Sequence, residues 1–181
     1  MDRRAPLVLL VLTACAPAAA PPPSSSGPPR INTSAGGTDI YIEADRSGST
    51  TTASAPVERV WTTLPEVYSS LGISGAVVDP AARVYGNPRL VVMRRLAGER
   101  LSTFFRCGET ATGSPIADAY RLRISVLTTL SPASAGETRV QTRASATAQS
   151  VEGASAAPVQ CASTGILEQR IGEMITRRAT A

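Results

Sequence analysis

The chain has 181 residues, which is enough for one ordinary domain with short appendages. It carries a formal net charge of +4 at pH 7, contains no histidine, and takes all 18 of its basic residues from arginine because lysine is absent. Without histidine and lysine, Ser–His–Asp and Cys–His catalysis, imidazole-bound zinc, Schiff-base chemistry and the P-loop lysine are excluded. We therefore expect a protein that is not an enzyme and holds no cofactor or metal. The small charge gives no reason to expect nucleic acid as a partner.

The first 14 residues are predicted to be a lipoprotein signal peptide. A short basic start, MDRR, precedes an apolar run of about eight residues, whereas a membrane-spanning helix needs roughly 20. The sequence LTAC at residues 12–15 resembles a bacterial lipobox, in which cleavage precedes the cysteine and the Cys15 thiol is diacylated. The alternative is an ordinary export signal cut in the alanine run that follows, but Pro21 would then follow the cut and Cys15 would have no role.

The resemblance to lipoprotein signals also implies a location. The residue after the modified cysteine is Ala16, whereas aspartate at that position commonly retains lipoproteins at the inner membrane. We therefore expect a cell-envelope protein that is attached to the outer membrane by its lipid and faces the periplasm. Two or three acyl chains hold a protein firmly at a membrane, because each buried methylene contributes about 0.8 kcal/mol.

Residues 15–37 are rich in proline, serine and alanine and show no periodic apolar face. Such a segment cannot offset its ordering entropy by burying apolar surface, so we expect a disordered linker. Proline-rich chain extends by about 3.1 Å per residue, which lets the linker hold the following domain some tens of ångströms from the membrane.

Residues 38–181 are predicted to form the folded domain, beginning with a strand at residues 38–44. A helix should follow, with Ser54 as its cap and Pro56 in its first turn, and Gly72 should end it. Its apolar positions recur with helical spacing: Val57, Val60, Trp61, Leu64, Val67, Tyr68 and Leu71. The two aromatic residues could line a pocket, but aromatics at this spacing are mostly core residues.

The rest of the domain reads mainly as strands. Two short strands are expected at residues 75–79 and 83–87, a third at residues 90–96, and residues 99–106 fit either a helix or a strand. Clear alternation predicts a long antiparallel pair, residues 120–126 with residues 139–146, across a turn at residues 131–136. Four apolar positions mark an amphipathic closing helix: Leu167, Ile171, Met174 and Ile175.

This order of elements predicts an α+β fold: a single domain in which an antiparallel curved sheet packs on two helices, as in helix-grip proteins. Residues 56–61 (PVERVW), 71–73 (LGI) and 83–84 (RV) are similar to the repeated domain of BamC-type outer-membrane lipoproteins. The resemblance covers about residues 56–87 and implies a helix-grip fold beside the machinery that inserts outer-membrane barrels. This chain has one such domain where that family has two.

Two further cysteines, Cys107 and Cys161, remain once Cys15 is acylated, and an even number in an exported protein favours a disulfide. The alternatives are two buried free thiols or a catalytic cysteine, and no histidine is present to lower a thiol pKa.

A set of arginines forms the candidate binding surface. Those on the polar face of the long strand pair are Arg121, Arg123, Arg139 and Arg143, with Arg94 and Arg95 expected nearby. Guanidinium groups suit phosphate and carboxylate, so this face could meet lipid head groups or an anionic envelope polymer; the alternative is an ordinary solvated sheet surface. The carboxylates near predicted turns show no spacing that marks a catalytic pair: Asp79, Glu99, Glu109 and Asp118.

These observations predict a non-enzymatic, lipid-anchored envelope protein that binds an envelope protein partner or assists envelope assembly. The alternative is a carrier of a small molecule or lipid, because a helix gripped by a sheet can leave an apolar cavity between them. The packing between the first helix and the sheet distinguishes the two hypotheses.

Overall fold

The computed structural model describes the backbone of residues 30–35 and 38–43, and both backbone and side chains of residues 48–151 and 157–181. The predicted signal peptide and the lipidation site Cys15 lie outside these residues. Within the part of the chain that is described, no helix combines the length and apolarity that crossing a membrane requires.

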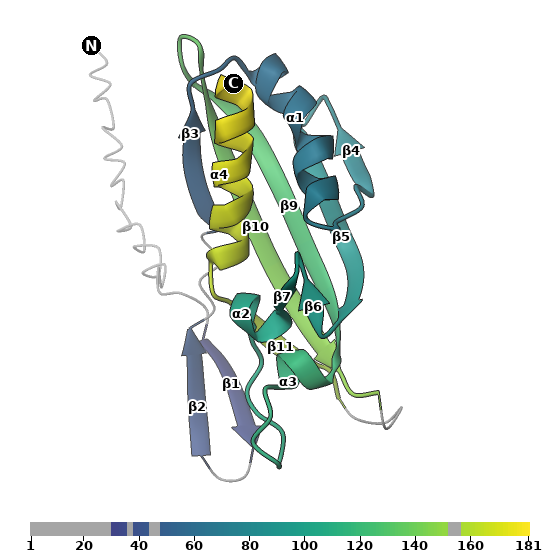
Figure 1. Ribbon diagram of the computed structural model, residues 1–181. Helices are drawn as coiled ribbons and strands as arrows, with labels where there is room; N and C mark the ends of the chain where they lie inside the picture. The colour runs from purple at the N-terminus through teal and green to yellow at the C-terminus, as the bar shows by residue number, and fades with distance from the viewer. Residues whose placement is uncertain (1–29, 36–37, 44–47, 152–156) are drawn as a thin grey trace, which may run out of the picture.

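The fold is α+β, as predicted, and its centre is an antiparallel sheet (Figure 1). The strands follow the order β4-β5-β9-β10-β11-β8, and β3 pairs with β10 alongside this path. Their bounds are β3 Ser49–Ala53, β4 Val77–Asp79, β5 Val84–Met93, β8 Phe105–Arg106, β9 Arg121–Ser134, β10 Glu137–Gln149 and β11 Val159–Ser163. The predicted long pair is β9 and β10, which run antiparallel from the pair Arg121↔Gln149 to the pair Glu137↔Ser134.

Two long helices, α1 (Val57–Ser70) and α4 (Ile166–Thr180), lie side by side on one face of the sheet (Figure 1). The fully buried side chains of this layer come from both helices and from β9: Val60, Leu64, Val67, Tyr68, Leu122, Ile124, Val126, Leu167, Ile171 and Ile175. All seven apolar positions predicted for the first helix belong to this core or pack against it. The single hydrophobic core therefore lies between the helices and one face of the sheet.

The first helix ends as predicted but begins differently. Gly72 adopts a φ of +73°, its N–H donates to the carbonyl of Ser69, and the N–H of Ile73 donates to the carbonyl of Tyr68, both at 2.9 Å. These two bonds form a Schellman motif. At the other end the cap is Pro56, in extended conformation and with no side-chain hydrogen bond, so the predicted Ser54 cap is wrong.

The late start of this helix has a physical reason. The buried hydroxyl of Thr138 on β10 donates to the carbonyl of Ala55 at 2.7 Å, and Ala55 itself is buried. This bond holds the chain against the sheet for two residues more than the sequence pattern suggests, so helical geometry begins only at Val57.

The strands expected at residues 83–87 and 90–96 are largely one strand, β5, with an irregularity in its pairing to β9 between Asn87 and Leu90. The side-chain carbonyl of Asn87 accepts the N–H of Arg89 at 2.8 Å, and its amide donates to the carbonyl of Ser74 at 2.9 Å. Asn87 thus provides the hydrogen bonds that the interrupted ladder lacks at this point.

Short elements fill residues 95–119. They are β6 (Arg95–Leu96), β7 (Glu99–Arg100), α2 (Leu101–Phe104) and α3 (Ile116–Ala119), with β8 directly after α2. Residues 99–106, which fitted helix or strand equally well, contain both. β6 and β7 pair as a small separate hairpin.

A second hairpin precedes β3. Strand β1 (Arg30–Ala35) pairs antiparallel with β2 (Thr38–Glu43). The strand predicted at residues 38–44 is present as β2, whereas residues 30–35, which the composition predicts to be linker, form its partner. The two glycines between these strands in the sequence are typical of tight hairpin connections, a signal that the proline-rich composition of the preceding residues obscures.

Candidate functional site

The sheet has one face against the helices and one face without a helical cover among the described residues (Figure 1). Along β9, buried residues alternate with outward-facing ones, because successive side chains of a strand point to opposite faces. We call the outward side, which carries Arg121, Arg123, Arg139 and Arg143, the open face. The alternation that predicted these arginines on one face is confirmed by their exposure.

The pairing of β9 with β10 fixes where each arginine of the open face lies. Arg121 and Arg123 lie near the start of β9, whereas Arg143 is opposite Leu127 and Arg139 is opposite Ser131. From the level of Arg121 to that of Ser131 the strand rises by about 33 Å, at roughly 3.3 Å per residue. The four guanidinium groups therefore form a stripe along the sheet and not one cluster.

None of these four arginines has a partner in the described part of the chain. The one ion pair among residues 48–151 and 157–181 joins Glu66 to Arg178 on the helical side. The outward-facing neighbours on the central part of β10 are uncharged: Gln141, Ser145 and Thr147. The open face therefore presents unpaired positive charge between hydroxyl and amide groups.

One end of the open face also exposes apolar side chains. Val91 and Met93 on β5 lie opposite Arg123 and Arg121, and they are 55% and 40% exposed. A shallow groove of about 280 Å³ lies here, lined by Val91, Arg121, Arg123, Thr147, Gln149 and Pro158. The pairing Met93↔Arg121 also confirms that Arg94 and Arg95, which follow directly, lie near this end of the stripe.

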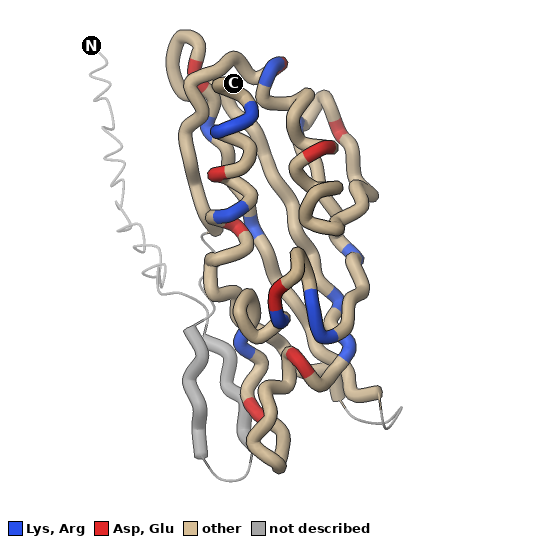
Figure 2. Tube along the Cα trace, viewed as in Figure 1, with Lys and Arg blue, Asp and Glu red and all other residues tan. Residues whose placement is uncertain are grey.

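Arg94 and Arg95 belong to a second site, which the sequence did not reveal. We call it the hairpin pocket: a hollow of about 410 Å³ lined by Arg94, Arg95, Arg100, Ser114, Pro115, Asp118 and Ala119. Figure 2 shows several arginine positions gathered around β6 and β7, with acidic positions among them. The sequence does not place Arg100 in this site, because residues 99–106 fit a helix and a strand equally well.

Of the four carboxylates near predicted turns, two accept hydrogen bonds that hold the fold together and two are exposed. Asp79 accepts the N–H of Ala82 at 2.9 Å and so closes the turn between β4 and β5. Asp118 accepts the N–H of Ser102 at 2.9 Å and its hydroxyl at 2.7 Å, which ties α3 to the start of α2. Glu99 and Glu109 are exposed. Within the described residues no three metal-ligating side chains come together.

The predicted disulfide is present: Cys107 and Cys161 are bonded, with their Cα atoms 4.3 Å apart. Both residues are buried. The bond joins the segment after β8 to β11, the strand that leads into α4. It therefore attaches the closing helix to the middle of the chain.

The space between α1 and the sheet is filled by side chains. Trp61 and Tyr68 both pack on Tyr85 of β5, with ring centroids 6.2 Å and 5.1 Å apart in edge-to-face geometry. Tyr68 is fully buried, and this burial raises the pKa of its phenol above the ordinary value of 10.0. Tyr68 is therefore a core residue, and Trp61 is partly buried and packs against the core, which agrees with the prediction of a packing role for both.

One buried carboxyl remains without a hydrogen bond in the described structure. Glu168 is 2% exposed, its Oε2 has no partner, and it lines a hollow of about 360 Å³ with Ser49 and Thr164. It is a first-turn residue of α4, where the backbone N–H groups carry partial positive charge. This position offsets the cost of burying the carboxyl without a ligand.

The chain was also compared with known proteins. No family model, curated protein or solved structure matches it.

Proposed function

We propose that this protein is a non-enzymatic, lipid-anchored component of the bacterial cell envelope that binds an acidic partner protein through the open face. The observation that carries the proposal is the stripe of four exposed arginines, none of which has a carboxylate partner in the described residues. The lipobox-like sequence at Cys15 supports the anchor, and the proline-rich linker supplies reach.

A protein suits this face better than a lipid bilayer. The arginines are spread over about 33 Å of a sheet surface and separated by groups that donate and accept hydrogen bonds. Spaced carboxylates on a folded partner can match such fixed positions, and arginine and methionine are both enriched in protein interfaces. Surfaces that insert into membranes usually present large aromatic and aliphatic side chains, and among the described strand residues of the open face the exposed side chains of that kind are Val91 and Met93.

The carrier hypothesis receives less support from the packing. A carrier needs an apolar cavity, and the layer between α1 and β9 is occupied by fully buried side chains. The resemblance to BamC-type lipoproteins makes the machinery that inserts outer-membrane barrels the first place to seek the partner.

The anchor is tested by expressing the full chain in a bacterial host supplied with labelled palmitate. Wild type should incorporate the label and sediment with membranes. Cys15→Ser should do neither, and Cys107→Ala with Cys161→Ala is the matched control that keeps the first cysteine. Equal labelling of wild type and Cys15→Ser would refute the lipid anchor.

The partner is tested by placing a photoreactive amino acid at Ser145, in the middle of the open face, or at exposed Glu173 on α4 as a control. Illumination of cells should link the Ser145 form to one envelope protein, and the product should decrease when Arg121 and Arg123 are changed to Gln. The Glu173 form should not give that product. Equal products from both positions, or crosslinks from Ser145 to lipid alone, would contradict the proposal.

A further inference from the structure

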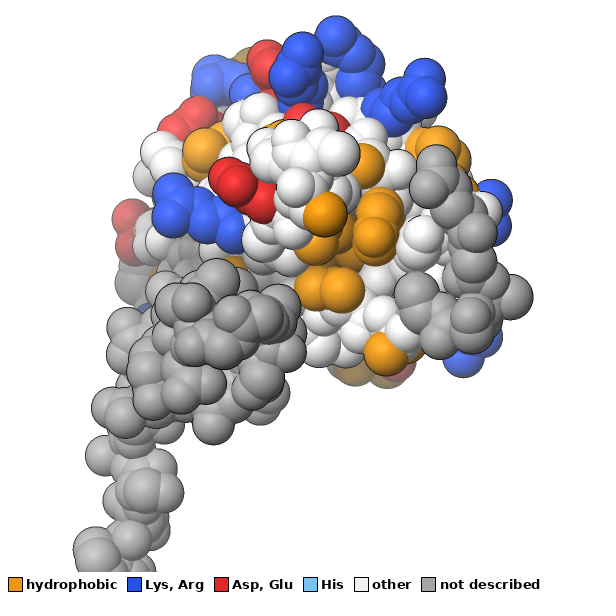
Figure 3. All heavy atoms as spheres, turned by 90° about the horizontal axis from the view of Figure 1, so that it is seen from below, with side chains coloured by type: hydrophobic (Ala, Val, Ile, Leu, Met, Phe, Trp, Pro, Cys, Tyr) orange, Lys and Arg blue, Asp and Glu red, His pale blue; other side chains and the backbone are white. Residues whose placement is uncertain are grey.

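We propose that the hairpin pocket is a binding site for a phosphate group. The pocket is formed by the β6–β7 hairpin and by α3 with the residues before it. Binding of phosphate there requires neither the open face nor the lipid anchor. Figure 3 shows the lower end of the molecule as drawn in Figure 1, with arginine side chains gathered along one edge of this view.

Two like charges lie directly opposite each other in the β6–β7 hairpin. Arg95 and Arg100 are directly paired across β6 and β7. Like charges in this arrangement destabilise a strand pair. Glu99, the neighbouring residue, forms no ion pair with either arginine in the described structure. A bound anion would convert this repulsion into attraction.

The hairpin pocket also contains hydrogen-bond donors that the described residues leave unused. A guanidinium group has five N–H donors, and Arg95 uses one of them on the carbonyl of Gly98 at 2.9 Å. Arg94 and Arg100 make no hydrogen bond to the described residues through their side chains, and the Ser114 hydroxyl is also exposed at the pocket. The pocket therefore offers several N–H and O–H donors that have no acceptor among the described residues.

The lining of the hairpin pocket carries more positive than negative charge. Three arginines and one carboxylate, Asp118, line the pocket. The carboxylate is already engaged, because both of its oxygens accept hydrogen bonds from Ser102. The pocket is left with an excess of positive charge, which suits an anion with two negative charges.

The backbone of the hairpin adopts conformations that its residues do not favour on their own. Arg94 and Ala97 have φ angles of +65° and +50°, in the left-handed region that residues other than glycine rarely adopt. The carbonyl of Arg94 accepts the N–H of Leu101 at 3.0 Å, and Leu101 is fully buried. The core thus fixes the bend that brings residues 94, 95 and 100 to one pocket. Strained backbone of this kind is common at binding sites.

Phosphate is the anion that these groups suit best. The planar fork of arginine matches two oxygens of a phosphate or carboxylate, and a tetrahedral phosphate can engage more than one fork at once. A volume of about 410 Å³ admits more than the phosphate itself. Free phosphate and the phosphate of a lipid head group share this chemistry, and the two arms of the test distinguish these sources.

The test uses the full chain, expressed with its signal sequence and purified in a nonionic detergent. Thermal unfolding is followed with increasing inorganic phosphate, and sodium chloride of equal ionic strength is the reference. A second series uses dihexanoyl phosphatidylglycerol below its micelle concentration. A ligand that binds only the folded protein raises the unfolding midpoint, and above the dissociation constant this rise grows with the logarithm of the ligand concentration, so its dependence on concentration gives the constant.

Two double variants lose the same charge at different places. Arg95→Gln with Arg100→Gln alters the hairpin pocket, and Arg139→Gln with Arg143→Gln alters the open face. We expect the pocket variant to bind at least tenfold more weakly than wild type, and the open-face variant to stay within twofold of it. Stabilisation by inorganic phosphate beyond the chloride reference identifies a free-phosphate site, and stabilisation by the lipid alone identifies a head-group site.

The pocket variant removes a repulsive pair, so without phosphate its unfolding midpoint should be no lower than that of wild type. If that variant folds poorly, Arg94→Gln gives the same readout with one substitution. Absence of stabilisation beyond the chloride reference by either probe in wild type, or equal weakening in both double variants, would overturn the proposal.

Discussion

The hydroxyl of Tyr68 on α1 lies 2.8 Å from the hydroxyl of Thr128 on β9, which in turn lies 2.8 Å from the hydroxyl of Thr142 on β10. All three residues are buried. The hydroxyl groups thus form a chain through the core that joins the first helix to the two central strands. Because a buried polar group without a partner is costly, this chain favours one position of α1 over the sheet.

Tyr68→Phe should lower the free energy of unfolding by about 1–2 kcal/mol, because it removes a buried hydrogen bond and leaves the ring in place. Urea unfolding at pH 7 measures the loss. Tyr120→Phe is the matched control, since that hydroxyl makes no hydrogen bond to the described residues and the side chain is only partly buried. Equal effects of the two substitutions would show that the hydroxyl chain contributes nothing specific.

Stability should fall above about pH 10 because of the same residue. Burial raises the pKa of Tyr68 above its ordinary value of 10.0, so the folded state retains the phenol proton where the unfolded state releases it. The stabilisation that comes from this difference in pKa is complete below pH 10, and it is lost as the pH rises from there toward the pKa of Tyr68 in the folded state. Wild type should lose up to about 1.4 kcal/mol per pH unit more than Tyr68→Phe in that range. Parallel pH profiles of the two proteins would contradict this.

Replacing Cys107 and Cys161 together with Ala should lower the free energy of unfolding by about 2–4 kcal/mol. The two cysteines are 54 residues apart in sequence, and the chain-entropy model gives about 4 kcal/mol for a loop of that size. Reduced wild type is the control, because it opens the bond and retains both sulfur atoms. A variant as stable as the oxidised protein would show that the bond does not stabilise the fold. Membrane attachment should be the same in the variant, the reduced protein and the oxidised protein.

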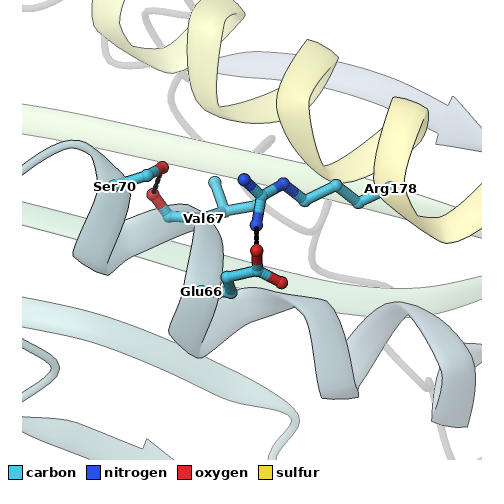
Figure 4. A network of polar contacts seen from close by, with 4 residues as sticks. All are labelled: Glu66, Val67, Ser70 and Arg178. Atoms are coloured by element: carbon cyan, nitrogen blue, oxygen red, sulfur yellow. Dashed lines mark hydrogen bonds and ion pairs between the residues drawn. The ribbon is translucent and has the colours of Figure 1, made fainter.

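Glu66→Gln should cost less than about 1 kcal/mol, although its carboxylate contacts Arg178 directly (Figure 4). The side chain of Glu66 is 75% exposed, so water and salt screen the pair that joins α1 to α4. The small loss should disappear in 1 M sodium chloride. Glu109→Gln, at an exposed carboxylate outside the ion pair, is the control, and a large loss that resists salt would show that the pair is effectively buried.

Several features of the fold followed from the sequence for clear physical reasons. Gly72 signalled the end of α1 because few other residues tolerate a positive φ there. The alternation in β9 and β10 predicted both the long strand pair and the exposure of its arginines. An even number of cysteines in the predicted mature chain was sufficient to suggest the disulfide, although spacing alone could not have proved the pairing.

Strand β3 escaped prediction because it lacks an apolar pattern. Its sequence is STTTA, and its neighbour on the helical side is the small residue Gly172 of α4. A Cβ atom on Gly172 would lie 2.8 Å from the hydroxyl oxygen of Thr51, so close packing here depends on the absence of a side chain. Hydrophobic periodicity does not record contacts of this kind. The hairpin pocket was missed for a related reason, since elements of two to four residues are too short to show a period.

The contact between β3 and α4 also sets the order in which the domain can form. Strand β3 comes from the beginning of the domain and α4 from its end, and β3 must in addition pair with β10, about 90 residues further along the chain. A ribosome or an export channel releases the beginning first, so β3 has neither of its neighbours until the chain is nearly complete. Formation of the core is therefore a late event in the release of the chain, and a product truncated before α4 would leave one side of the sheet exposed to proteases and chaperones.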